Sequence, residues 1–126
     1  MKKIIVTGGL GFIGSNLIEL LIKKKFFVIN IDKATYSSNF YNTKEFIKSK
    51  KYKFFKRNIK DKKISKILFK FKPAAIFNLA AETHVDRSID NPDSFIQSNI
   101  VGTYNLLECF KNYSKRNKSK LIHIST

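Results

Sequence analysis

Residues 3–32 read KIIVTGGLGFIGSNLIELLIKKKFFVINID, and this stretch by itself predicts one β-α-β unit. Lys3 to Thr7 is a short apolar run rich in β-branched residues, which is typical of a strand buried on both faces of a parallel sheet. Phe12 to Lys25 repeats leucine and isoleucine at helical spacing, so a helix is expected there. Phe27 to Ile31 is predicted to be the second strand, and it ends at Asp32.

Three glycines punctuate the turn between the first strand and the helix: Gly8, Gly11 and Gly14. The first permits a tight turn, the second lets backbone N–H groups approach a pyrophosphate, and the third allows the helix to pack closely on the strand. The start of the helix adds unpaired N–H groups and the positive end of a dipole. We therefore expect a dinucleotide phosphate site here, in preference to a purely structural turn.

Asp32 stands where a ribose-binding carboxylate is expected. It follows Gly14 by 32 − 14 = 18 residues, close to the ~20-residue spacing of the acid that accepts hydrogen bonds from the adenosine ribose. A carboxylate there disfavours a 2′-phosphate, so NAD is expected rather than NADP, although the ammonium of Lys33 could pair with such a phosphate. The alternative for Asp32 is a capping role in a loop.

The rest of the chain continues to alternate helices and strands. The expected elements are a short helix near Thr43 to Ser49, a strand over Tyr52 to Lys56, a helix from Asp61 that Pro73 stops, a strand over Ala74 to Leu79, a long helix capped by Asn91, and a strand over Leu121 to Ser125. The long helix is expected to carry, at spacings of four, three, four and three, the residues Ile96, Ile100, Thr103, Leu107 and Phe110. This alternation predicts an α/β fold, a Rossmann-type doubly wound parallel sheet in the order 3-2-1-4-5, truncated after the fifth strand.

Composition narrows the class of protein. A net charge of +16 would favour nucleic acid as a partner, but only three of the 25 basic residues are arginine, so a solvated lysine-rich surface is preferred. The lone Cys109 cannot form an internal disulfide, which suits the cytoplasm. Neither a signal peptide nor a membrane span is expected, and no metal site is predicted.

Four segments resemble a known family: Thr7 to Gly14, Ile31 to Tyr36, Asn78 to Ile89, and Asn99 to Thr103. They are similar to segments of the extended short-chain dehydrogenases and, among these, of the dTDP-glucose 4,6-dehydratase family. The third segment is the most specific, because related epimerases usually differ after the paired alanines.

The resemblance implies which residues line the cofactor and substrate. Those at the NAD site would be Gly8, Gly11, Phe12, Ile13, Gly14, Asp32, Lys33, Ala34, Thr35, Asn58, Ile59, Leu79, Ala80, Ala81, Glu82, Thr83 and Ser98. Thr83 and Thr126 would touch the sugar nucleotide, and Thr126 would also take part in catalysis. The family usually has Gly-Asp where this chain has Arg57-Asn58, so the adenine amino group would meet the uncharged carbonyl oxygen of Asn58, and weaker adenine binding is expected.

The activity implied is the NAD-dependent conversion of dTDP-glucose to dTDP-4-keto-6-deoxyglucose by a homodimer. It needs a helical Tyr-x-x-x-Lys and an Asp-Glu pair after the threonine that matches Thr126, and neither is found in residues 1–126. We therefore expect these residues to be an incomplete NAD-binding domain without the substrate domain, inactive alone. Tyr52 and Lys56 show the tyrosine-lysine spacing, but on a predicted strand that spacing separates the two side chains.

Four polar residues are interpreted as structural rather than catalytic. His84, Asp86 and Arg87 are expected to shape the pocket rather than act as acid or base, and His123 is expected to be a hydrogen-bonded core histidine. Two functions remain as alternatives to the dehydratase. One is a UDP-sugar 4-epimerase of the same superfamily, and the other is a non-catalytic module that binds a dinucleotide or nucleic acid.

Overall fold

One parallel sheet of five strands organises the molecule. The structure, a computed structural model, describes residues 1–34, 40–80 and 92–124. The strands are β1 (Lys3–Thr7), β2 (Phe27–Asp32), β3 (Tyr52–Lys56), β4 (Ala75–Asn78) and β5 (Lys120–His123). They run parallel in the order β3-β2-β1-β4-β5, which confirms the predicted Rossmann-type topology.

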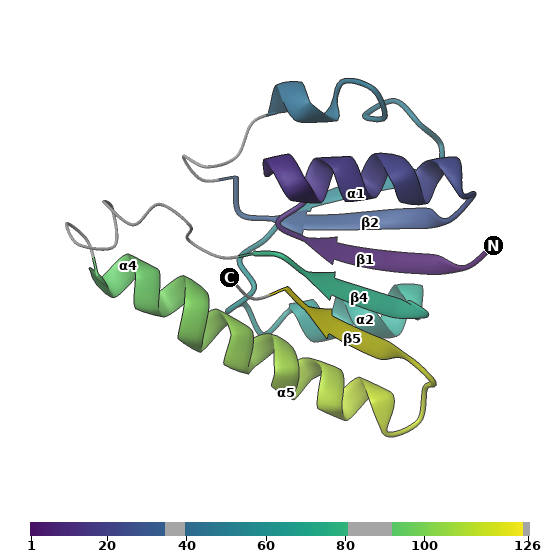
Figure 1. Cartoon of the computed structure of the whole chain (residues 1–126). Coiled ribbons are helices and arrows are strands. Elements are labelled where there is room, and N and C mark those ends of the chain that lie inside the picture. The colour runs from purple at the N-terminus through teal and green to yellow at the C-terminus, as the bar shows by residue number, and fades with distance from the viewer. Residues whose placement is uncertain (35–39, 81–91, 125–126) are drawn as a thin grey trace.

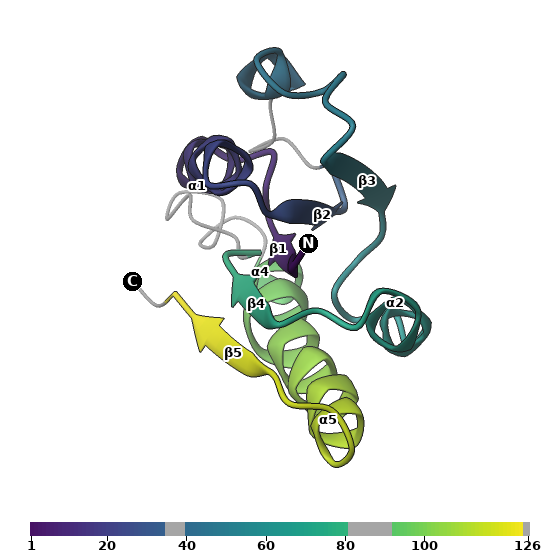
Figure 2. The same ribbon diagram turned by 90° about the vertical axis from the view of Figure 1, so that its right-hand side faces the viewer.

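Helices cover both faces of this sheet. Helix α1 (Phe12–Lys23) lies on one face, while α2 (Ile64–Phe71) and α5 (Gly102–Ser114) lie on the other, as Figures 1 and 2 show. None of the helices in the described part of the chain has both the length and the apolar character needed to cross a membrane.

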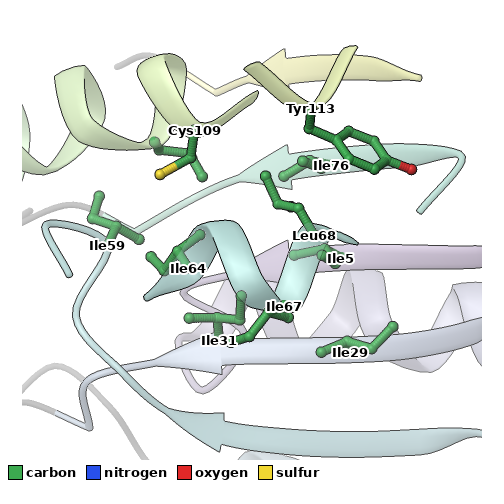
Figure 3. Packing of buried hydrophobic residues seen from close by; sticks show 11 residues of the cluster. Ile5, Ile29, Ile31, Ile59, Ile64, Ile67, Leu68, Ile76, Cys109 and Tyr113 are labelled. Atoms are coloured by element: carbon green, nitrogen blue, oxygen red, sulfur yellow. The ribbon is translucent and has the colours of Figure 1, made fainter. Parts of the chain in front are cut away.

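The side chains of the central strands alternate between two hydrophobic clusters. Ile5, Ile29 and Ile31 pack with residues of α2 and α5 (Figure 3), whereas Ile4, Val6 and Val28 pack with Ile18 and Leu21 of α1. Because β2 alternates strictly, Asn30 and Asp32 share the α1 side with Val28. The polar residues of β2 therefore lie on the side of the sheet where the glycine turn leads into α1.

The helix predicted near Thr43 to Ser49 is wrong. A 3₁₀ helix, η1 (Phe40–Thr43), precedes that stretch, and residues 44–48 form turns. The carbonyl of Thr43 accepts hydrogen bonds from the amides of both Phe46 and Ile47, and Ser49 bonds back only three residues, to Phe46. The segment turns because the buried Phe46 side chain anchors it against the α1 side of the core.

Two other helix boundaries differ slightly from expectation. Helix α1 ends at Lys23 rather than Lys25, and α2 begins at Ile64 rather than Asp61. The Asp61 carboxylate accepts a hydrogen bond from the Lys63 amide at 2.8 Å, so a tight turn precedes the helix.

The residues at helical spacing in the long helix do not form one buried face, although Phe110 among them packs against the core. Helix α4 (Pro92–Ile96) passes into a π-helical turn, η2 (Gln97–Val101), before α5 begins. A π-helical turn accommodates an extra residue and so shifts the phase of the helix. The buried residues of α5 are Gly102, Leu106, Cys109 and Tyr113, whereas Ile96, Ile100 and Leu107 are exposed.

Candidate dinucleotide site

Strand β2 holds the glycine turn by three successive backbone amides. The Gly8 amide donates to the carbonyl of Ile31 at 2.9 Å. The Gly9 amide donates to Oδ1 of Asn30 at 3.0 Å, and the Leu10 amide donates to Oδ2 of Asp32 at 3.0 Å. The turn is thus fixed to the end of β2 before α1 begins.

The Gly11 amide donates back to the carbonyl of Gly8 at 3.2 Å, and the three amides after it differ, because they belong to the first turn of α1. Ser15 makes the first helical bond, to the carbonyl of Gly11 at 2.9 Å, and no side chain caps the helix. Within residues 1–34, 40–80 and 92–124, no acceptor meets the amides of Phe12, Ile13 and Gly14. Three N–H groups at the positive end of a helix dipole form a site for an anion such as a diphosphate.

Gly8 and Gly14 are required by the protein's own packing. Gly8 has φ +76°, and a Cβ there would lie 2.7 Å from the carbonyl carbon of Leu79. A Cβ on Gly14 would lie 2.8 Å from Cα of Gly9. These two glycines bring the turn against the end of β4 and the start of α1 against the turn.

Gly11 is different, because nothing in the described protein excludes a side chain there. Its φ of −72° is ordinary for any residue, and a Cβ would have a single neighbour, the carbonyl oxygen of Gly8 at 3.4 Å. The space is open beside the unpaired amides of α1. This is the space that the backbone-approach role of the middle glycine requires.

Alanine at Gly8 is expected to destabilise the fold by about 2–5 kcal/mol. The left-handed conformation costs an alanine about 1–2 kcal/mol, and overlap with the Leu79 backbone adds roughly 1–3 kcal/mol. Urea unfolding followed by circular dichroism measures this change. A loss below about 0.5 kcal/mol, the range of ordinary surface substitutions, would contradict the packing described for Gly8.

Asp32 links the glycine turn to the loop after β2. Its Oδ1 accepts a hydrogen bond from the Ala34 amide at 2.7 Å, while Oδ2 holds Leu10. Ala34 adopts φ +58°, a left-handed conformation that this bond helps to hold. Asp32 thus makes the loop-capping bond of the alternative interpretation, and its ribose role stays a prediction.

The other described candidates border the same edge of the sheet. Leu79 and Ala80 follow β4 beside Gly8, and their amides donate to the carbonyl and hydroxyl of Thr7 at 3.0 and 3.2 Å. The Arg57 amide donates to the carbonyl of Asp32 at 3.1 Å, so Asn58 lies close to the end of β2.

The surroundings of Asn58 and Ile59 limit the contacts that each residue could make with a ligand. Oδ1 of Asn58 already accepts a bond from the Lys60 amide at 3.1 Å, which leaves one lone pair for an adenine amino group. The Ile59 side chain is buried in the core cluster, so only its backbone could face a ligand. Lys33 is half-buried directly after Asp32.

Several predicted residues fall where the structure makes no statement. Thr35, Ala81, Glu82, Thr83 and Thr126 lie outside the described residues, as do His84, Asp86 and Arg87. Ser98 lies in η2, but its side chain is outside the described part.

The tyrosine and lysine that mimic a catalytic pair are on strand β3, as predicted. Burial raises the pKa of Tyr52 above its usual value. The hydrogen bond from Asn30 opposes this in part, and the negative charge of Asp32 adds a smaller raising effect. A catalytic tyrosine base needs a lowered pKa, so Tyr52 is not suited to that role.

Sequence reasoning missed a polar network beneath the site. The Thr7 hydroxyl donates to Oδ1 of Asn78, and both residues are buried. Nδ2 of Asn78 lies 3.0 Å from Nδ1 of His123. His123 is hydrogen-bonded as expected but exposed rather than in the core, because β5 is the edge strand of the described sheet. A polar residue at the end of an apolar strand, as in Asn78, is the signal that could have revealed this network.

Known proteins share this fold and sequence. The sequence model of the family described as GDP-mannose 4,6 dehydratase matches residues 5–126. A dTDP-glucose 4,6-dehydratase of Haemophilus influenzae is 47% identical, over 100% of this chain and 40% of that protein. The chain thus spans about two fifths of the length of this relative.

Solved structures agree with the sequence matches. A dTDP-glucose 4,6-dehydratase from Bacillus anthracis, in complex with NAD, has a TM-score of 0.85 and 34% identity, covering 100% of this chain and 38% of that one. A UDP-glucose 4-epimerase from Thermotoga maritima, with UDP-glucose, has a TM-score of 0.84 and 33% identity, covering 98% and 38%.

Proposed function

Since the chain belongs to the GDP-mannose 4,6-dehydratase family, we propose that its 126 residues are the cofactor-binding part of an NAD-dependent dTDP-glucose 4,6-dehydratase. The observation that carries this proposal is the row of amides at Phe12, Ile13 and Gly14. They meet no acceptor among the described residues and adjoin a turn that β2 holds in place. The NAD complex of the relative from Bacillus anthracis supports the choice of cofactor.

The residues present fit a dinucleotide. The amides of the first turn of α1 would bind the diphosphate, and Gly11 leaves room for it. The Asp32 carboxylate, held by Leu10 and Ala34, would accept hydrogen bonds from the adenosine ribose. Leu79 and Ala80 border the crevice at the end of β4, the switch point where open α/β sheets bind ligands.

NAD and the described residues would have different roles in the reaction. When bound, NAD supplies the redox chemistry, the removal of hydride from C4 of the sugar and its return at C6. The residues described here bind and orient it. The elimination of water would take place at the same edge of the sheet, where Thr83 and Thr126 would contact the sugar nucleotide. The part of the relatives that this chain does not span would complete this site.

The protein encoded by the complete reading frame tests this function. Incubation with dTDP-glucose and NAD should yield a product lighter than the substrate by one water, detected by mass spectrometry. Conversion of UDP-glucose to an isomer of equal mass would instead support the epimerase alternative, which the Thermotoga maritima structure keeps in view. Salt-sensitive binding of DNA or RNA without either reaction would favour the non-catalytic alternative.

We propose further that the whole enzyme is a cytoplasmic homodimer and that the long helix forms its interface. Five apolar residues on α4, η2 and α5 are exposed together: Ile96, Ile100, Val101, Tyr104 and Leu107. An exposed apolar patch of this kind marks an interaction surface.

Lysine at Ile100 and Leu107 together should raise the dimer dissociation constant by about 10–100-fold, because it places charge in an apolar interface. Sedimentation equilibrium of the complete protein measures this constant. Leu20→Lys is the matched control, since Leu20 is an exposed apolar residue on α1. Equal dimerisation of all three proteins would contradict the assignment.

A further inference from the structure

An amide side chain lies buried inside an otherwise apolar strand. Asn30 interrupts the sequence FVINID of β2, and its side chain has no exposed surface. Burying a carboxamide is unfavourable unless its polar atoms are hydrogen-bonded. Both ends of this carboxamide are bonded, to Gly9 on one side and to Tyr52 on the other.

The bond to Gly9 belongs to the attachment of the glycine turn. It is the middle one of three that hold successive amides, between Gly8 on the Ile31 carbonyl and Leu10 on Asp32. Asn30 also occupies the space into which a Cβ of Gly9 would project, so the turn and the side chain are in close contact. The three amides of α1 that remain unpaired begin only two residues after Leu10.

The Gly9 amide sets the orientation of the carboxamide, and Tyr52 anchors its other end. The Gly9 N–H can only donate, so Oδ1 of Asn30 faces it, and Nδ2 donates to the Tyr52 hydroxyl at 3.0 Å. The reversed amide would place two donors against each other at Gly9. The Tyr52 ring is itself fixed by an edge contact with Phe46, with ring centroids 4.8 Å apart. Its raised pKa keeps the phenol neutral at neutral pH.

We propose that Asn30, anchored by Tyr52, is a positioning residue for cofactor binding that fixes the Gly9 amide and so directs the amides of Phe12 to Gly14 at the diphosphate. This role rests on the proposed NAD function. Neither side chain needs to touch the cofactor, because both act through the turn. The pair thus adds a fourth strand, β3, to the support of a site formed by β1, β2 and β4.

Two variants test the pair in the 126-residue chain. Asn30→Leu removes both hydrogen bonds at similar volume, and Tyr52→Phe removes only the hydroxyl that anchors Asn30 while it keeps the ring against Phe46. Val28→Ala is the control, because Val28 is a fully buried residue on the same face of β2 that has no contact of this kind with the turn. Urea unfolding gives the stability of each variant, hydrogen exchange follows the Gly8 and Gly9 amides, and calorimetry gives the dissociation constant of NAD.

We expect Asn30→Leu to speed exchange at Gly9 more than at Gly8 and to weaken NAD binding by about tenfold relative to Val28→Ala, after correction for stability. Tyr52→Phe should do the same to a smaller degree, and it carries the test should Asn30→Leu not fold. If the wild-type chain binds NAD and the Asn30, Tyr52 and Val28 variants all bind it with equal affinity, the positioning role alone is overturned. Wild-type chain that is folded but does not bind NAD would overturn the proposed function as well.

Discussion

Alanine at Gly11 is expected to weaken NAD binding by about 10–100-fold and to leave the folded chain as stable as before, since a side chain pressed against a ligand costs roughly 1–3 kcal/mol. The backbone at Gly11 suits any residue, and the protein offers a new Cβ only one neighbour, at 3.4 Å. The methyl group would instead occupy the space beside the unpaired amides at the start of α1. Loss of NAD binding without loss of stability is expected when the added methyl group occupies space that the ligand needs.

Isothermal titration calorimetry and urea unfolding of the Gly11→Ala chain measure the two effects separately. Gly8→Ala is the matched comparison, because the same added methyl group there meets the Leu79 backbone. The two substitutions should therefore differ in kind, with binding lost at Gly11 and stability lost at Gly8. Unchanged NAD affinity in Gly11→Ala would mean that the diphosphate does not lie at this turn.

Alanine at Asp32 is expected to lower both stability and affinity. The amides of Leu10 and Ala34 lose their acceptor, and each amide left without a partner in a buried setting costs about 1–3 kcal/mol. The free energy of unfolding should therefore fall by roughly 2–6 kcal/mol. Loss of a charged acceptor for the ribose should weaken NAD binding by about 10–100-fold on its own, since hydrogen bonds to charged groups contribute about 1.5–3 kcal/mol.

Asp32→Asn separates these contributions. The amide keeps one oxygen, so one of the two backbone bonds survives and the other meets a second donor. We expect its stability to lie between wild type and Asp32→Ala, with NAD affinity reduced because the ribose loses an ionised partner. An Asp32→Ala chain as stable as wild type would contradict the stabilising role of the two hydrogen bonds by which Asp32 links the glycine turn to Ala34.

The elements that the sequence predicts well are those whose signals are local. The spacing of Gly8, Gly11 and Gly14 and the apolar runs beside them define β1, the turn and α1 within a few residues. The buried face of α5 was not predictable in the same way. A π-helical turn at Gln97–Val101 shifts the helix by a residue, and no periodicity within α5 records that shift.

The site shows the same division between local and distant information. The position of Asp32 relative to Gly14 predicts a ribose carboxylate, but its bond to the Leu10 amide depends on how β2 meets the turn. Asn30 could be noticed as a polar residue in an apolar strand. Its role could not be derived, because its partner Tyr52 belongs to β3 and becomes a neighbour only through the sheet register of Val28 with Tyr52.

Titration of NAD into the folded 126-residue chain, followed residue by residue in amide proton-nitrogen NMR spectra, tests the central claim most directly. The unpaired amides of Phe12, Ile13 and Gly14 should shift most, with saturation at submillimolar to millimolar cofactor, and the signals around Asp32 should follow the same binding curve. Spectra of a folded chain that stay unchanged at millimolar NAD, or that change only far from the start of α1, would contradict it.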